Sequence, residues 1–89
     1  MNPHVQSVRA LDDYRLDLVF TNGERRVFDA RPYLDHGVFV RLRHPGFFRT
    51  VRVVAGSVEW PGEIDLCYDT VYLEGQPVDT PELASAPDA

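Results

Sequence analysis

Six side chains of types that commonly do chemistry are spread along this chain without a spacing that would bring them together. They are Asp29, His36, His44, Asp65, Cys67 and Asp69. The two histidines are eight residues apart, unlike the close pairs that bind one metal ion from a single helix or strand. The aspartates are better explained as acceptors for neighbouring backbone N–H groups than as general bases. We therefore expect no catalytic residues, no metal site and no cofactor.

Cys67 and Trp60 have structural explanations. Cys67 is the single cysteine, so it cannot form an internal disulfide, and a small buried hydrophobic residue is its expected role. Trp60 is assigned to the core because Val53 is its expected partner across a hairpin. One cysteine agrees with a reducing compartment, and no run of consecutive apolar residues exceeds three. We expect a cytoplasmic protein with no membrane segment.

The arginines are the one group of side chains with a possible binding role. All nine basic residues are arginine, and they give residues 1–54 a net charge of +3, whereas residues 55–89 carry −8. Either the two halves pair within the folded chain, or the arginines form a surface for an acidic partner. A net charge of −5 is unlike that of a nucleic-acid-binding protein, so carboxylates on a partner protein are the better target. The candidate partner-binding residues are Arg25, Arg26, Arg41, Arg43, Arg49 and Arg52.

The elements that would position these arginines begin with two strands. Val5 and Val8 indicate a first strand. Leu16, Leu18 and Phe20 alternate with other residues at the period of two that is typical of a half-buried strand.

A tight turn follows the second strand. Asn22-Gly23 is typical of a type I′ hairpin turn. A two-residue loop places Leu18 opposite Val27, so the buried face is expected to continue through Val27, with Arg25 at its rim.

The middle of the chain is expected to be short helices and turns. Asp29 can cap a short helix over residues 30–35, and Gly37 can end it in a left-handed conformation. Residues 38–50 are apolar without a clean period and are interrupted by His44-Pro45-Gly46. Irregular turns that fill part of the core are the expectation there.

A second hairpin is expected over residues 51–55 and 58–60, about a type II′ turn at Gly56-Ser57. This register places Val53 opposite Trp60 on the buried side, with Arg52 diagonal to Glu59 on the other. A short extended piece and a helical turn over residues 68–73, closed by Gly75, complete the pattern.

The sequence thus predicts a single α+β domain over residues 1–79. Its two antiparallel β-hairpins form a small sheet, with short helices or helical turns packed against it. Residues 80–89 are small, acidic and proline-containing, and a disordered acidic tail is expected there.

The chain resembles Domain of Unknown Function 2442, a family of small bacterial proteins. The resemblance is carried by Asp13-Tyr14 with Leu16 and Leu18, Phe20-x-x-Gly23-Glu24, Asp29, Gly37-x-Phe39-x-x-Leu42, Phe48, residues 51–53, Trp60, Gly62-x-Ile64-Asp65-Leu66 and Asp69-x-x-Tyr72. It implies no catalytic residues. It also implies an arrangement like that of toxin–antitoxin pairs, because members are often encoded beside another small protein. Some relatives append a helix-turn-helix domain, but no segment here is long and periodic enough to be a recognition helix.

These observations favour a non-enzymatic module that binds a protein partner, in an antitoxin-like relation to a small protein encoded beside it. A weak nucleic-acid-binding or regulatory protein that uses the arginine-rich first half is the alternative, and an enzyme is the least favoured reading. A homodimer is also expected, through exposed strand edges at residues 5–10 or 51–55, with Arg52 and Glu59 near the interface.

Overall fold

The computed structural model describes residues 2–78, which fold into two antiparallel sheets. The order of strands in the first sheet is β1-β2-β3-β7, with β1 (Val5–Leu11), β2 (Arg15–Phe20), β3 (Arg25–Asp29) and β7 (Gln76–Pro77). The second sheet has the order β4-β5-β6, with β4 (Arg52–Val54), β5 (Ser57–Trp60) and β6 (Ile64–Leu66). The expected α+β class is confirmed.

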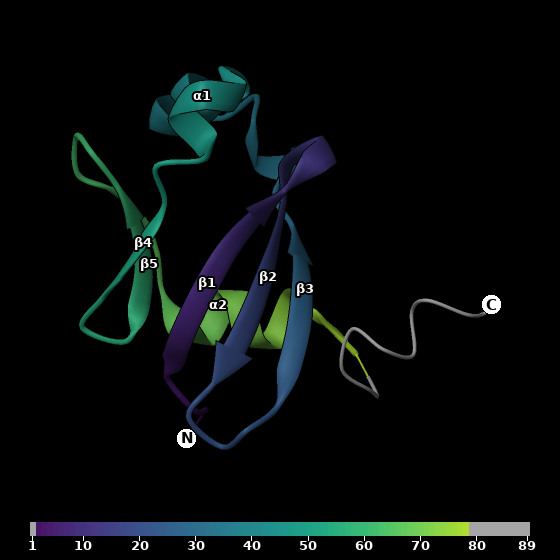
Figure 1. Cartoon of the computed structure of the whole chain (residues 1–89). Helices are drawn as coiled ribbons and strands as arrows, with labels where there is room; N and C mark the ends of the chain where they lie inside the picture. The colour runs from purple at the N-terminus through teal and green to yellow at the C-terminus, as the bar shows by residue number, and fades with distance from the viewer. Residues whose placement is uncertain (1, 79–89) are drawn as a thin grey trace, which may run out of the picture.

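Short helices cover one face and one end of these sheets. The α-helices are α1 (Pro45–Phe48) and α2 (Tyr68–Glu74), and the 3₁₀ helices are η1 (Asp12–Tyr14), η2 (Arg31–Tyr33) and η3 (Gly37–Arg43). Figure 1 shows α2 crossing behind β1, β2 and β3, while α1 lies at one end of the molecule. We call η3 and α1 together, residues 37–48, the cap.

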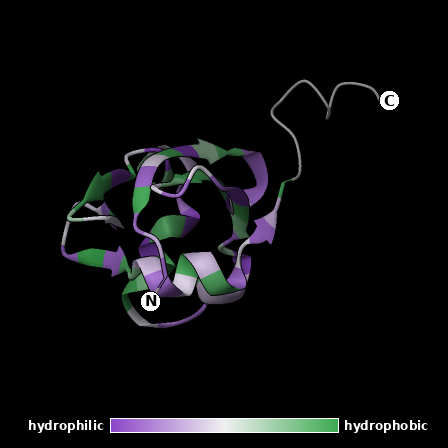
Figure 2. Cartoon of the chain, turned by 90° about the horizontal axis from the view of Figure 1, so that it is seen from below, coloured by the Kyte–Doolittle hydropathy of each residue, from purple (hydrophilic) through white to green (hydrophobic). Residues whose placement is uncertain are grey.

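The core lies between the first sheet, α2, the second sheet and the cap. Leu16, Leu18 and Phe20 are fully buried, which confirms the predicted alternation along β2. Trp60 is also fully buried, as expected. Figure 2 shows the corresponding alternation of apolar and polar residues along the strands. The opposite face of the first sheet is here called the outer face, and it carries charged side chains such as Arg9, Asp17 and Arg25.

The loop of the first hairpin has three residues, and the two-residue turn predicted there is wrong. The N–H of Phe20 donates to the carbonyl of Glu24, and the N–H of Gly23 donates to the carbonyl of Phe20, both at 2.8 Å. Gly23 has a φ of 88°, in the left-handed region. A left-handed residue in third position completes a three-residue hairpin loop with a bulge.

The extra loop residue moves the register of β3 by one position. Leu16 lies opposite Phe28, and Val27 lies opposite Asp17 on the outer face. Phe28 therefore continues the buried face instead of Val27. Arg25 also lies on the outer face, where it bonds to Asp17, and not at the rim of the core.

The second hairpin differs from the prediction by two positions. Val53 lies opposite Val58, not Trp60, and Arg52 lies directly opposite Glu59. The turn residues Ala55 and Gly56 have φ values of 52° and 82°, so both are left-handed, as a type I′ turn requires. Because side chains alternate with a period of two, this shift left the predicted buried face unchanged.

Residues 30–50 are more regular than expected. The predicted helix over residues 30–35 is the 3₁₀ turn η2, and Gly37 is left-handed as predicted, with a φ of 51°. The stretch expected to be irregular contains η3 and α1. A 3₁₀ helix needs an apolar residue only at every third position to bury one row, which explains why no helical or strand period was visible.

The two sheets meet through β1 and β4, the strands whose edges were expected to be open. Their residues are in contact, and the N–H of Val5 donates to the carbonyl of Gly56 at 2.8 Å. Within residues 2–78, the helices are all too short to cross a membrane. The expected tail at residues 80–89 lies outside the described part of the chain.

Candidate functional site

The structure keeps the chemistry-bearing side chains singled out from the sequence apart. Their positions run from the end of β3 through the cap to α2, and their side chains are exposed except for the half-buried Asp29. Within the part of the chain that the structure describes, His, Cys, Asp and Glu side chains form no group of three that could hold a metal ion.

The aspartates have local structural partners. Asp29 accepts the backbone N–H of Arg31 at 3.0 Å, as a capping residue would, and also pairs with the Arg31 guanidinium. The hydrogen bond from that side chain lowers the pKa of Asp29. At α2, the N–H of Tyr68 donates to the hydroxyl of Ser57 at 3.0 Å instead of to an aspartate, and Asp69 accepts from the amide of Asn2. Capping therefore explains Asp29 but not Asp69.

Cys67 is exposed, so the expectation of a small buried side chain is wrong. Ile64 and Leu66 in β6 are both buried and lie on one face. By the period of two along a strand, Asp65 and Cys67 point to the other face, which is open to solvent.

Arg25 contributes to an ion-pair group on the outer face of the first sheet. Its Nε and Nη2 atoms donate to the two carboxylate oxygens of Asp17, each at 2.9 Å, and Arg9 donates to the same carboxylate at 3.0 Å. Asp17 is 9% exposed. The side-chain hydrogen bond from Arg25 lowers the pKa of Asp17, and this effect outweighs the opposite effect of burial.

Arg26 points to the opposite face of β3 and holds the end of α2. Its Nη1 atom donates to the carbonyls of Tyr72 and Gly75, at 2.8 and 3.2 Å, and its guanidinium lies 3.9 Å from the centroid of the Tyr72 ring. Its Nε atom donates to Glu24 at 2.7 Å. A cation that binds the last carbonyls of a helix stabilises that end, so Arg26 has a structural role.

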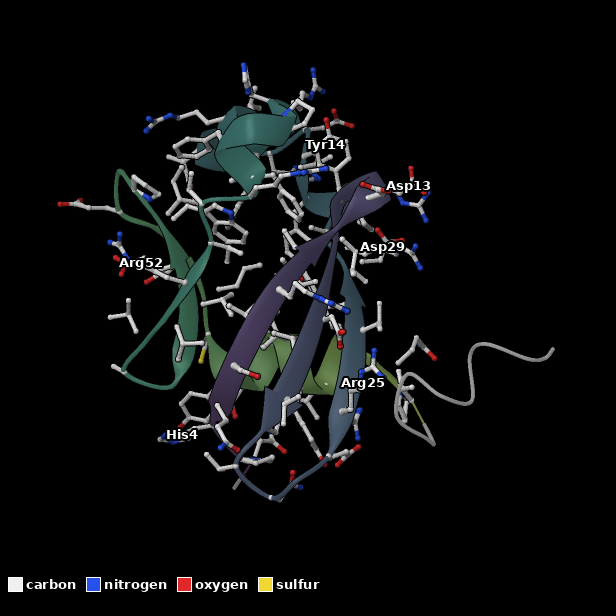
Figure 3. All side chains as sticks on the ribbon, in the orientation of Figure 1. His4, Asp13, Tyr14, Arg25, Asp29 and Arg52 are labelled. Carbon is white, nitrogen blue, oxygen red and sulfur yellow. The ribbon has the colours of Figure 1, made fainter. Side chains whose placement is uncertain are left out.

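Of the other four candidate arginines, three lie on or next to the cap and Arg52 lies on β4. Arg43 pairs with Asp35 and donates to the carbonyl of Leu34. Arg49 pairs with Asp12 at 3.3 Å. Arg52 pairs with Glu59 at 3.7 Å, and in Figure 3 it lies beside β4, away from Arg25 on the first sheet. The structure therefore divides the six predicted residues into two arginines of β3 with separate structural contacts, three at the cap, and Arg52 on the second sheet.

The ion pairs of residues 2–78 lie mostly within the arginine-rich first half, so this part of the chain gives little support to the expected pairing between the two halves. Among the described residues, Arg52 with Glu59 is the ion pair that joins the halves, and the other ion pairs lie within residues 1–54. Within residues 55–78, the acidic side chains of Glu63, Asp65, Asp69 and Glu74 are exposed.

The 3₁₀ helix of the cap exposes two apolar side chains that the sequence had assigned to the core. Leu42 is fully buried and Phe39 is half-buried, as expected for positions three apart in a helix with three residues per turn. Val38 and Val40 point outward and are 55% and 43% exposed. The spacing of three between Phe39 and Leu42 was the sequence signal that could have identified Val38 and Val40 as exposed.

Arg41 shares this exposed surface. Its guanidinium lies over the ring of Phe47, 5.0 Å from the centroid, and next to the backbone of Gly62. None of the ion pairs within residues 2–78 includes Arg41. We define the cap surface as Val38, Val40, Arg41 and Arg43.

A strained turn between β1 and β2 contacts the cap. Asp13 and Tyr14 have φ values of 64° and 60°, which are uncommon for residues other than glycine. The hydroxyl of Tyr14 donates to the backbone carbonyl of Arg43, and its ring meets Phe48 edge-on with centroids 5.4 Å apart. Asp13 and Tyr14 lie at the cap end of the sheet in Figure 3. Together with Phe48 they line a hollow of about 220 Å³. The contacts that Tyr14 makes with the cap offset the cost of this backbone conformation.

Fold and surface together define a small α+β domain in which two antiparallel sheets support a helical cap with an arginine- and valine-bearing surface. The model of the family described as Protein of unknown function (DUF2442) matches residues 5–77, and the chain belongs to this family. The match spans the seven strands of residues 2–78, and the resemblance seen in the sequence is confirmed. No curated protein and no solved structure matches the chain.

Proposed function

We propose that this chain is a non-enzymatic protein-interaction module whose partner is a small protein encoded beside it, with the chain in an antitoxin-like role. The observation that carries the proposal is the pair of outward valines on the cap. The exposed large apolar side chains of the described chain are Val38, Val40, Val54 and Leu73. Val38 and Val40 lie in the two outward rows of one short 3₁₀ helix, and exposed apolar side chains gathered on one element are typical of surfaces that bind protein.

The cap surface is held rigidly enough to serve as such a surface. Leu42 is fully buried beneath it, and Phe48 accepts a hydrogen bond from the Trp60 indole at 2.9 Å. Tyr14 anchors the carbonyl of Arg43 from the first sheet. A surface that is already ordered loses little conformational entropy when it binds, so its apolar contacts contribute more to affinity.

The test is co-expression of the chain with the product of the adjacent gene, followed by purification through a tag on this chain. We expect a complex of defined mass by size-exclusion chromatography with light scattering. Replacing both cap valines, Val38→Ser with Val40→Ser, should weaken it. Leu73→Ser is the matched control, because Leu73 is 67% exposed but lies on α2. Recovery of the free chain alone, or equal weakening by the control, would contradict the proposal.

A further inference from the structure

The chain around the cap carries positive charge without any acidic residue. Residues 36–58 contain Arg41, Arg43, Arg49 and Arg52 and no Asp or Glu. Three of these arginines form ion pairs with carboxylates outside this segment. The pairs are Arg43 with Asp35, Arg49 with Asp12 and Arg52 with Glu59. The cap therefore presents cationic groups in a protein whose net charge is −5.

Arg41 is the cation of the cap that no carboxylate of residues 2–78 neutralises. Its side chain is nevertheless held in position, because the guanidinium lies over the Phe47 ring and against Gly62. A Cβ atom built on Gly62 would lie 2.5 Å from the Nη1 atom of Arg41, which shows how closely the two approach. An arginine stacked on an aromatic ring is preorganised and still presents N–H donors at its edge.

The exposed ion pairs nearby can be exchanged at low cost. The side chains of Arg43 and Asp35 are 57% and 75% exposed, and those of Arg49 and Asp12 are 67% and 86% exposed. Ion pairs so exposed contribute about 0–1 kcal/mol, so a carboxylate from a partner can replace the internal one. Arg43 and Arg49 are therefore available to a partner as well as Arg41.

In a 3₁₀ helix, positions three apart lie one above the other. Val38 therefore lies in a row with Arg41, and Val40 lies in a row with Arg43. We propose that the cap surface binds an acidic amphipathic segment of the partner protein, with carboxylates on Arg41 and Arg43 and apolar side chains on Val38 and Val40. The inference rests on the proposed function and adds the chemistry of the partner to it.

An acidic protein segment fits this surface better than a nucleic acid does. Val38 and Val40 have no complement on a phosphodiester backbone, whereas they match the apolar side chains of an amphipathic segment. The acidic second half of the chain would also repel a polyanion at long range, but it acts less on a short segment that reaches only the cap.

Fluorescence polarisation with labelled peptides tests the inference directly. The probe is a helical peptide of leucine and glutamate, and the matched peptides replace glutamate by lysine or leucine by serine. We expect the Leu/Glu peptide to bind most tightly, and Arg41→Gln to weaken that binding by about tenfold, the effect of losing one charge-assisted contact. Arg9→Gln is the control, since Arg9 is 70% exposed but lies on the outer face of the first sheet.

Three results would overturn the inference: equal binding of the Leu/Lys peptide, no effect of Arg41→Gln, or tighter binding of labelled duplex DNA than of peptide at the same salt concentration. The complex with the neighbouring gene product separates this inference from the proposed function. If the double variant Val38→Ser with Val40→Ser dissociates that complex while Arg41→Gln and added salt do not, the result supports the interaction module. The same result contradicts the inference that the partner segment is acidic.

Discussion

The indole nitrogen of Trp60 donates a hydrogen bond to the backbone carbonyl of Phe48, with 2.9 Å between the two atoms. Trp60 belongs to β5 and Phe48 to the cap, and their ring centroids are 5.8 Å apart. Both side chains are almost fully buried. This contact joins the second sheet to the element that carries the candidate binding surface.

Trp60→Phe should lower the free energy of unfolding by about 2–4 kcal/mol, because it leaves a cavity and an unpaired buried carbonyl at Phe48. Urea unfolding followed by circular dichroism measures this, since the variant removes the only tryptophan. Val54→Ser, at a position 41% exposed, is the control and should change stability by less than about 0.5 kcal/mol. A similar loss in both variants would show that the contact is unimportant.

Asp17→Asn should destabilise the protein near neutral pH by about 1–2 kcal/mol, because the carboxylate accepts hydrogen bonds from two arginines. Since the folded state lowers the pKa of Asp17, this stabilisation is present above the unfolded pKa of about 3.9 and is lost as the pH falls through the lower folded value. The gap between the wild-type and variant unfolding curves should therefore close in acid.

Asp35→Asn is the control for this pH series. Asp35 is 75% exposed in its pair with Arg43, so its loss should change stability by less than about 0.5 kcal/mol. A gap for Asp17→Asn that stays constant from neutral pH into acid would mean that the charge of Asp17 is not what stabilises the fold.

Gly75→Ala should destabilise the protein by about 1–3 kcal/mol through overpacking. An added Cβ atom would lie 2.6 Å from the carbonyl oxygen of Val71 and 3.1 Å from the Cβ atom of Arg26. Gly46→Ala is the control, because there the nearest atoms belong to the flexible end of His44, at 3.3 Å. Thermal unfolding compares the two, and an equal effect would exclude the steric explanation.

A homodimer remains a prediction, although β1 and β4, whose edges were expected to be open, contact each other. β4 is the terminal strand of the second sheet, and Val54 at its end is 41% exposed. We expect light scattering at micromolar concentration to give twice the mass of the chain, and Val54→Lys to return it to the monomer mass, since a charge on an edge strand opposes pairing. A monomer mass for the unaltered chain across salt and concentration would refute the dimer and leave the protein partner untouched.

Much of the fold could be read from local patterns. The alternation of Leu16, Leu18 and Phe20 identified β2 and its buried face, and the turn residues located both hairpins. These predictions succeeded because side-chain direction along a strand depends only on the parity of the position.

Loop length was not readable in the same way. Asn22-Gly23 suits a two-residue turn, yet Gly23 closes a three-residue loop, and the shift by one moved Val27 to the outer face and Phe28 to the core. In the second hairpin the shift was by two, so Val53, Val58 and Trp60 kept their common face. The difference arises because an odd shift reverses the parity of a strand and an even shift keeps it.

Only part of the candidate surface, its arginines, could be predicted from the sequence. The charge distribution identified the arginines as the residues to consider, because charge is a property of each side chain alone. Which of them share a surface depends on where the hairpins, cap and sheets lie in space. Arg25 and Arg26 lie on opposite faces of one strand. Arg41 and Arg43 lie on the same surface as Val38 and Val40. That grouping arises because the core buries Phe39 and Leu42, which form the inward row of the 3₁₀ helix. The tertiary structure therefore decided which side chains of this helix remained exposed.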